Sequence, residues 1–251
     1  MSAADKIRVK ILRQNQPEEQ SYWDEFDVAY TPNMNVITLL QEIQRNPVNV
    51  SGNQVHPVAW ECSCLEEVCG ACTMVINGHV RQACTALVDQ IDKPIVLEPM
   101  RKFPVIRDLV VDRSRMFETL KKVHAWVEID GTYDLGPGER RAPEDQMEAY
   151  EYARCMTCGC CLDACPQVND ANPFFGAAIL AQVRLFNIHP TGKYEKATRL
   201  RAVMGLGGIH ECGNAQNCAR VCPKEIPLVT AIARLNRDVI AQSVKDFLFE
   251  K

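Results

Sequence analysis

The first hundred residues show two kinds of spacing between their apolar side chains. Alternation of apolar and polar residues is typical of half-buried strands, and apolar residues at i, i+3, i+4 and i+7 are typical of an amphipathic helix. These patterns predict strands over 7–11, 25–30, 73–76, 79–84 and 95–97, and one helix over 36–43. Asn77-Gly78 predicts a tight hairpin turn between two of the strands, and Asn33 or Asn35 is suited to cap the helix.

From residue 108 onward the apolar spacing is helical. The pattern predicts helices over 108–127, 146–155, 175–188, 194–204 and 226–248. Asp108 is a suitable cap for the first of them, and the Gly-, Pro- and charge-rich stretch 130–145 predicts a surface loop. The fold class is therefore expected to be α+β, with a mixed domain over 1–107 and an all-α domain over 108–251.

Composition and charge narrow the range of functions. The chain has 251 residues, of which 47% are hydrophobic and 24% charged, as expected for a globular protein. Its formal net charge of −4 gives no electrostatic basis for binding nucleic acid. We expect no signal peptide, and no transmembrane segment, because no apolar run approaches the roughly 18 residues that span a bilayer. Thirteen cysteines, odd in number and tightly clustered, argue against disulfides and predict a reducing compartment.

The first cysteine group has the spacing C-x4-C-x2-C followed by one distant cysteine, which is the plant-type [2Fe–2S] pattern. Its members are Cys64, Cys69, Cys72 and Cys84, the last expected at the end of a hairpin strand. Gly70 allows the backbone to approach the inorganic sulfides. A structural zinc site also uses four cysteines, but it usually pairs two C-x2–4-C motifs. Cys62 fits no ligand position, and we expect it to be a small buried side chain.

Two further cysteine runs each end in Cys-Pro. The first has the spacing C-x2-C-x2-C-x3-C-P, and the second has the same spacing with Ala215 at its second position. In bacterial two-cluster ferredoxins the fourth cysteine of such a run binds the other cluster. This rule predicts a [4Fe–4S] cluster on Cys155, Cys158, Cys161 and Cys222. Because an alanine methyl cannot bind iron, it also predicts a [3Fe–4S] cluster on Cys165, Cys212 and Cys218. Cys160 is surplus and is expected to be a packed thiol.

Three clusters of different type in one chain indicate a relay for single electrons. We find no nucleotide-binding loop and no catalytic triad pattern. The order and spacing of the cysteine groups resemble those of the iron–sulfur subunits of succinate dehydrogenase and fumarate reductase, the family of respiratory complex II. The stretch 104–112 resembles the segment between the two domains of that family. The resemblance implies an N-terminal β-grasp ferredoxin domain followed by an α-helical ferredoxin domain.

The resemblance also implies partners and a location. A flavoprotein subunit with FAD and the dicarboxylate site is expected near the [2Fe–2S] end, and a membrane cytochrome with haem b near the [3Fe–4S] end. Electrons would pass from FAD through [2Fe–2S], [4Fe–4S] and [3Fe–4S] to quinone, or the reverse. The chain is then expected to lie on the cytoplasmic side of the cell membrane as a peripheral subunit.

Two departures from the ubiquinone-reducing members bear on the quinone. Some of those members have a Trp shortly after the first Cys-Pro and a His directly after the first cysteine of the second run. This chain has Gln167-Val168-Asn169 and Gly213 in those places, so only Pro166 is carried over as a quinone contact. The stretches 182–192 and 212–218 are similar to menaquinone-linked bacterial members, which pair with a single di-haem cytochrome b.

Two other functions remain open from the sequence. One is an iron–sulfur subunit for a different flavoprotein, of the thiol-linked fumarate reductase or glycolate oxidase type. It is disfavoured because no further cysteine-rich region follows residue 222. The other is a zinc-binding or scaffold protein, which metal analysis would distinguish.

Overall fold

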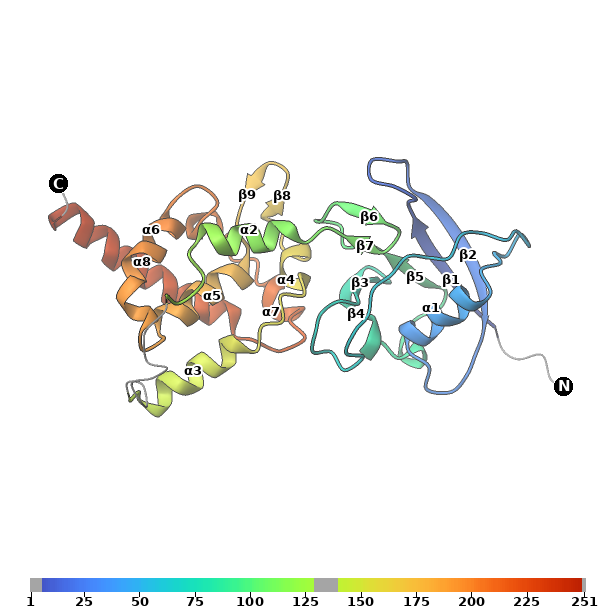
Figure 1. Ribbon diagram of the computed structural model, residues 1–251, viewed down its shortest axis with the longest axis horizontal. Coiled ribbons are helices and arrows are strands. Elements are labelled where there is room, and N and C mark those ends of the chain that lie inside the picture. The colour runs from blue at the N-terminus through green and yellow to red at the C-terminus, as the bar shows by residue number, and fades with distance from the viewer. Residues whose placement is uncertain (1–5, 129–139, 250–251) are drawn as a thin grey trace. The chain divides into compact units, whose positions relative to one another are not determined.

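The computed structural model describes residues 6–128 and 140–249, which fold into two compact units (Figure 1). The N-terminal unit comprises the chain up to Arg113 together with Met156–Asp163. The helical unit comprises Ser114–Cys155 and the chain from Ala164 onward. The short segment Met156–Asp163 is thus separated from the rest of its unit by some forty residues of sequence. The functional domain boundary expected after residue 107 stays a prediction.

The N-terminal unit is built on a mixed five-stranded sheet with the order β2-β1-β5-β3-β4. Strands β1 and β5 run parallel, and the other neighbouring strands are antiparallel. The elements of this unit are β1 (Lys6–Arg13), β2 (Tyr22–Ala29), α1 (Val36–Arg45), β3 (Thr73–Ile76), β4 (His79–Gln82), η1 (Ala83–Thr85), η2 (Val88–Gln90), β5 (Ile95–Glu98), β6 (Val105–Arg107), β7 (Val110–Val111) and α4 (Cys160–Asp163). One helix on a mixed sheet confirms the α+β class expected from the sequence.

The alternating pattern of the first strands explains how the core forms. In β1 the side chains of Ile7, Val9 and Ile11 are at most 3% exposed, and they join the apolar face of α1 in one core. The cap of α1 is Asn35, whose side-chain oxygen accepts a hydrogen bond from the Thr38 amide at 2.9 Å. Capping by Asn35 satisfies an amide that would otherwise lack a partner at the helix start.

The hairpin predicted around Asn77-Gly78 is confirmed as β3 and β4. Its second strand is shorter than expected, because β4 ends at Gln82. Cys84 therefore lies in the short 3-10 helix η1 and not on a strand. The Ala83 amide donates to the Cys72 carbonyl at 3.1 Å, which holds this turn against the end of the first cysteine loop.

The helix predicted over 108–127 is wrong at both ends. The chain first makes the small β6-β7 hairpin, and α2 spans only Ser114–Lys122. Asp108 is not a cap but is fully buried, where its carboxylate accepts from Arg13 Nε at 2.7 Å and from the Ala59 amide at 2.8 Å. A buried carboxylate needs such partners because its charge is costly away from water.

The helical unit consists mainly of helices. It also contains one small hairpin, whose two strands have two residues each and which the sequence pattern did not predict. Its elements are α2 (Ser114–Lys122), α3 (Pro143–Ala153), β8 (Val168–Asn169), β9 (Asn172–Pro173), α5 (Ala177–Asn187), η3 (Gly192–Glu195), α6 (Lys196–Met204), η4 (Ile209–Glu211), α7 (Asn217–Arg220) and α8 (Leu228–Phe249). Helix α3 begins at Pro143, inside the stretch predicted as a loop, and residues 130–139 of that loop lie outside the described residues.

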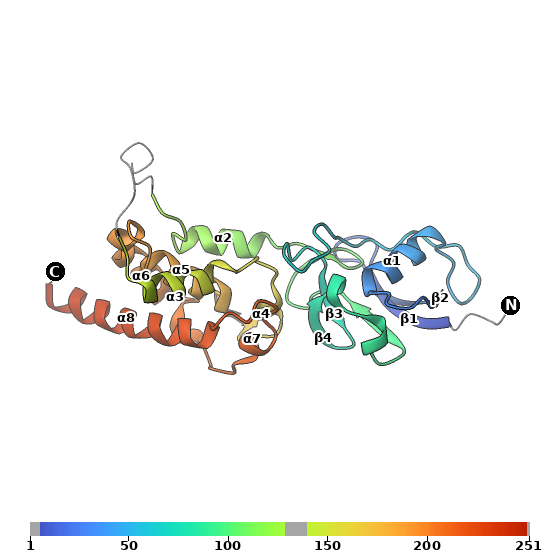
Figure 2. The ribbon, with the colours of Figure 1, turned by 90° about the horizontal axis from the view of Figure 1, so that it is seen from below.

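Helix α8 is the longest element of this unit, and α5 and α6 pack beside it (Figures 1 and 2). Leu235 and Val239 of α8 are at most 1% exposed, as is Leu180 of α5, so this contact forms the centre of the helical core. Arg199 of α6 is also fully buried and donates to the carbonyls of His124 and Trp126. Within the described part of the chain, no helix is both long enough and apolar enough to cross a bilayer.

Candidate iron–sulfur centres

The loop between Cys64 and Cys69 turns its amide groups toward a cysteine sulfur. The amides of Glu66, Val68 and Cys69 donate to Cys64 Sγ at 3.4, 3.2 and 3.3 Å. These hydrogen bonds lower the pKa of the Cys64 thiol to about 7. Leu65 and Glu67 have positive φ values of 61° and 55°, a conformation that side chains rarely adopt. The backbone of the loop is therefore strained at these two residues, and this conformation places N–H groups around the sulfur.

Cys72 and Cys84 approach the same loop from the hairpin. Burial, a hydrogen bond with Cys72 and the charge of the nearby Cys64 sulfur together raise the pKa of the Cys84 thiol to about 11. The Thr85 hydroxyl donates to the Glu67 carboxylate at 2.8 Å, which joins the turn after Cys84 to the loop. All four predicted ligands of the first site therefore lie in one part of the N-terminal unit.

The donor set of this site fits a [2Fe–2S] cluster. Four cysteine sulfurs supply the thiolates that such a cluster requires, and the amides directed at them offset negative charge. The Ala71 amide donates to Cys69 Sγ at 3.4 Å, so the sulfur of Cys69, like that of Cys64, receives a backbone hydrogen bond. Among the described residues, no three His, Cys, Asp or Glu side chains are arranged around the position of a single metal ion.

Cys62 is exposed, so the prediction that it is buried is wrong. Its sequence neighbours Glu61 and Ser63 are exposed as well. Residue type alone predicted burial, but the path of the backbone decides the exposure of this thiol.

The middle of the first Cys-Pro run packs on the N-terminal unit. The Lys102 amide donates to the Asp163 carboxylate at 2.9 Å, and Gln82 Nε2 donates to Cys160 Sγ at 3.3 Å. Cys160 is 0% exposed, which agrees with the packed thiol expected there. A hydrogen bond from Cys160 and the charge of Arg113 together outweigh the effect of burial and lower the pKa of Cys158 to about 7.

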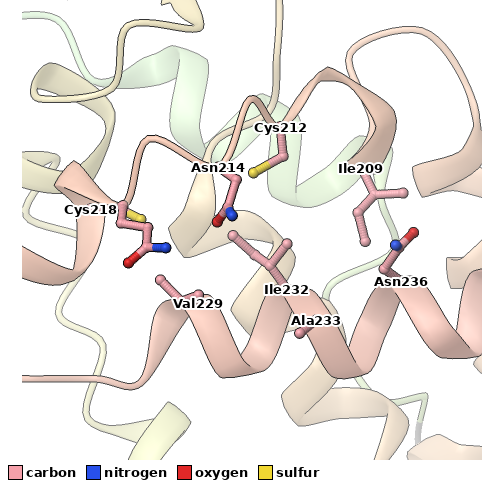
Figure 3. A pocket seen from close by; sticks show the side chains of 9 residues that line it. Ile209, Cys212, Asn214, Cys218, Val229, Ile232, Ala233 and Asn236 are labelled. Carbon is pink, nitrogen blue, oxygen red and sulfur yellow. The ribbon is translucent and has the colours of Figure 1, made fainter.

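A third group of cysteines lies in the helical unit, at a cavity of about 310 Å³. Cys212 and Cys218 line this cavity on one side, and Val229, Ile232 and Ala233 of α8 line it on the other (Figure 3). Burial raises the pKa of the Cys218 thiol, and the sulfurs of Cys165 and Cys212 act on it in the same direction. The three predicted [3Fe–4S] ligands therefore lie within electrostatic reach of one another.

The surroundings of Gly213 explain one departure noted in the sequence. A Cβ atom at Gly213 would lie 2.7 Å from Gln167 Nε2, so the Gln167 side chain takes the space beside this glycine. Gln167 Oε1 in turn accepts from Asn172, which also donates to Glu211. Pro166, the carried-over quinone contact, is exposed.

The remaining predicted ligands can be placed only within their own units. Cys161 is buried on the segment that packs on the N-terminal unit, as Cys158 is. Cys155 and Cys222 belong to the helical unit, and both are half-buried. Ala215, the position that lacks a thiol, is exposed and lies between Cys212 and Cys218 in sequence.

Two family models match the chain. Residues 8–118 match the 2Fe-2S iron-sulfur cluster binding domain, and residues 151–226 match the 4Fe-4S dicluster domain. The fold, the cysteine loops and these matches define the class of protein: a two-domain iron–sulfur protein for electron transfer.

Whole-chain relatives specify the family. The chain is 58% identical to the succinate dehydrogenase iron-sulfur subunit of Bacillus subtilis, over 98% of each chain. It is 31% identical to the fumarate reductase iron-sulfur subunit of Wolinella succinogenes, over 88% of this chain and 90% of the relative. The chain therefore belongs to the family of iron–sulfur subunits of succinate dehydrogenase and fumarate reductase. In fold it is similar to a chain of the Mycobacterium smegmatis Sdh1 complex in the apo form, with a TM-score of 0.79 at 23% identity, covering 96% of this chain and 98% of that chain.

Proposed function

We propose that the chain is the electron-transfer subunit of a membrane-bound succinate:quinone oxidoreductase. Its clusters relay electrons from FAD through [2Fe–2S], [4Fe–4S] and [3Fe–4S] to quinone, or in the reverse direction. The observation that carries the proposal is the division of its ligand cysteines into sets of four, four and three, in a chain whose relatives include both a succinate dehydrogenase and a fumarate reductase subunit.

Each set is assigned to one cluster. We assign [2Fe–2S] to Cys64, Cys69, Cys72 and Cys84. We assign [4Fe–4S] to Cys155, Cys158, Cys161 and Cys222. We assign [3Fe–4S] to Cys165, Cys212 and Cys218. Ala215 supplies no fourth thiolate to the last set. Cys212 and Cys218 line one cavity and the charge of Cys165 acts on Cys218, which supports a three-iron centre on these three sulfurs.

A flavoprotein subunit with FAD and the dicarboxylate site is the proposed partner at the [2Fe–2S] end. Leu65 and Val68, on the loop around Cys64, are 50% and 57% exposed. Apolar side chains at the tip of a strained cluster loop are suited to be covered by a partner. We take residues 1–107 as the domain that serves this partner and 108–251 as the domain that serves the quinone side.

A membrane cytochrome with haem b is the proposed partner at the [3Fe–4S] end. The face of α8 that lines the cavity beside Cys212 continues along the helix, at spacings of three or four residues, to Ile240, Val244 and Phe247. These three side chains are 56%, 54% and 88% exposed. These exposed apolar side chains support docking of an apolar partner. The position proposed for the chain is peripheral, on the cytoplasmic side of the membrane.

Menaquinone is the proposed acceptor, with Pro166 as a contact. Support comes from the absence of the ubiquinone-type Trp and His, and from Gln167, which takes the space beside Gly213. The identity to the Bacillus subtilis relative, 58% over nearly the whole chain, also favours a bacterial arrangement.

Metal analysis and co-purification test this function together. We expect about nine irons per chain, no stoichiometric zinc and three distinct cluster signals by electron paramagnetic resonance (EPR). The chain should co-purify with a subunit that carries FAD and with one that carries haem b. Stoichiometric zinc with little iron would refute the relay. Co-purification with a flavoprotein but without haem would favour a different flavoprotein complex.

A further inference from the structure

Arg113 binds the loop of the first cluster site. Its Nη1 donates to the Gly70 carbonyl at 2.8 Å, and its Nη2 donates to the Ala71 carbonyl at 2.9 Å. The Gly70 carbonyl also accepts from the Thr73 hydroxyl at 2.7 Å. Two donors of one planar guanidinium are thus held by neighbouring carbonyls, and this restricts the position of the positive charge.

The same loop lies against a predicted ligand of the second cluster. A Cβ atom at Gly70 would lie 2.7 Å from Cys158 Cβ and 2.9 Å from Cys158 Cα. The backbone can therefore approach Cys158 this closely only because residue 70 has no side chain.

The Nε of Arg113 is buried and has no hydrogen-bond partner among the residues that the structure describes. A buried N–H without an acceptor costs free energy, so this donor is available to a group bound beside it. Because Arg113 binds the Gly70 carbonyl and Gly70 lies against Cys158, the charge of Arg113 is held near this cysteine. A fixed positive charge and an unused donor are therefore available beside this thiol.

We propose that Arg113 raises the reduction potential of the cluster that Cys158 binds. The inference rests on the proposed function, because it requires Cys158 to be a [4Fe–4S] ligand. A cluster gains one negative charge when it is reduced, so a positive charge nearby stabilises the reduced form more than the oxidised form. Arg113 is thus a positioning residue that links the loop of the first cluster to the potential of the second.

Redox titration of the purified complex, followed by EPR, tests the proposal. Arg113→Gln should make reduction of the second cluster about tenfold less favourable, which is a fall of about 59 mV for a one-electron couple. Arg113→Lys keeps the charge and should stay within about threefold of the wild type. Arg45→Gln is the matched control, because it removes a charge from the same unit at a side chain that is 73% exposed. It should leave the potential unchanged.

The outcomes separate this inference from the proposed function. A wild-type complex without a [4Fe–4S] signal would refute the ligand assignment itself. A normal signal whose potential does not change in Arg113→Gln would refute only the role of Arg113. An equal fall in Arg45→Gln or in Arg113→Lys would also overturn it. If Arg113→Gln loses iron, Arg113→Lys decides: wild-type potential supports the proposal, and a lowered potential or lost iron refutes it.

Discussion

The close approach of Gly70 to Cys158 predicts a steric effect that can be separated from backbone strain. Gly70→Ala places a methyl group 2.7 Å from Cys158 Cβ, well inside the optimal separation of carbon atoms. Gly78→Ala is the matched control on the β3-β4 hairpin of the same unit. The two glycines have similar positive φ values, 71° and 81°, but a Cβ at Gly78 would meet nothing within 4 Å.

The expected cost follows from these two contributions. An alanine at positive φ costs about 1–2 kcal/mol, and this term is shared by both variants. Overpacking of a tightly packed contact adds about 1–3 kcal/mol, and this term applies only to Gly70. Gly70→Ala should therefore lose about 2–5 kcal/mol of unfolding free energy. Gly78→Ala should lose about 1–2 kcal/mol.

Thermal unfolding of the purified complex, followed by circular dichroism at one scan rate, measures the difference. Each kcal/mol corresponds to about 2–4 °C in a chain of this length, so Gly70→Ala should unfold about 2–12 °C below Gly78→Ala. Iron content should be measured in parallel, because the displaced segment carries predicted ligands. Equal midpoints for the two variants would show that Cys158 moves away freely and would refute the close contact.

Three further substitutions test other parts of the structure. Asp108→Asn removes the nearer of two buried carboxylates beside Arg13, at 2.7 Å, and leaves only Asp24 at 3.6 Å. It should cost about 1–3 kcal/mol in denaturant unfolding, whereas Asp27→Asn, in a surface ion pair, should change little; equal effects would contradict this. Ala215→Cys should replace the oxidised [3Fe–4S] EPR signal with a [4Fe–4S] cluster of lower potential, and an unchanged signal would refute the assignment of this position. Cys160→Ser should keep all three cluster signals, and loss of the [4Fe–4S] signal would identify Cys160 as a ligand.

The cysteine loops and the regular elements could be predicted because they depend on local sequence. Alternation set the strands of the sheet, and the spacing of Cys64, Cys69 and Cys72 indicated a loop bent around a common centre. Asp108 was misassigned because a carboxylate before a helical pattern is equally suited to a cap and to a buried ion pair. Only the contact with Arg13, which lies 95 residues away in sequence, shows that Asp108 belongs to a buried ion pair.

The location of the segment Met156–Asp163 could not be predicted for a similar reason. Local spacing identified its cysteines as ligands but contained no information about which surface they pack on. That surface is made by Gln82, Lys102 and their neighbours, which the chain reaches some sixty to eighty residues earlier. Periodicity shows which side of an element is apolar, whereas long-range contacts determine the surface against which that side packs.

The segment Met156–Asp163 is synthesised after the rest of the N-terminal unit. The ligands of the first site, Cys64 to Cys84, are made well before Cys158 and Asp163. At about 5–20 residues per second, the segment follows Arg113 by roughly 3–10 s, and the surface near Met100 stays uncovered during that interval. All the cysteines of the first cluster site are therefore synthesised before the first ligand of the second.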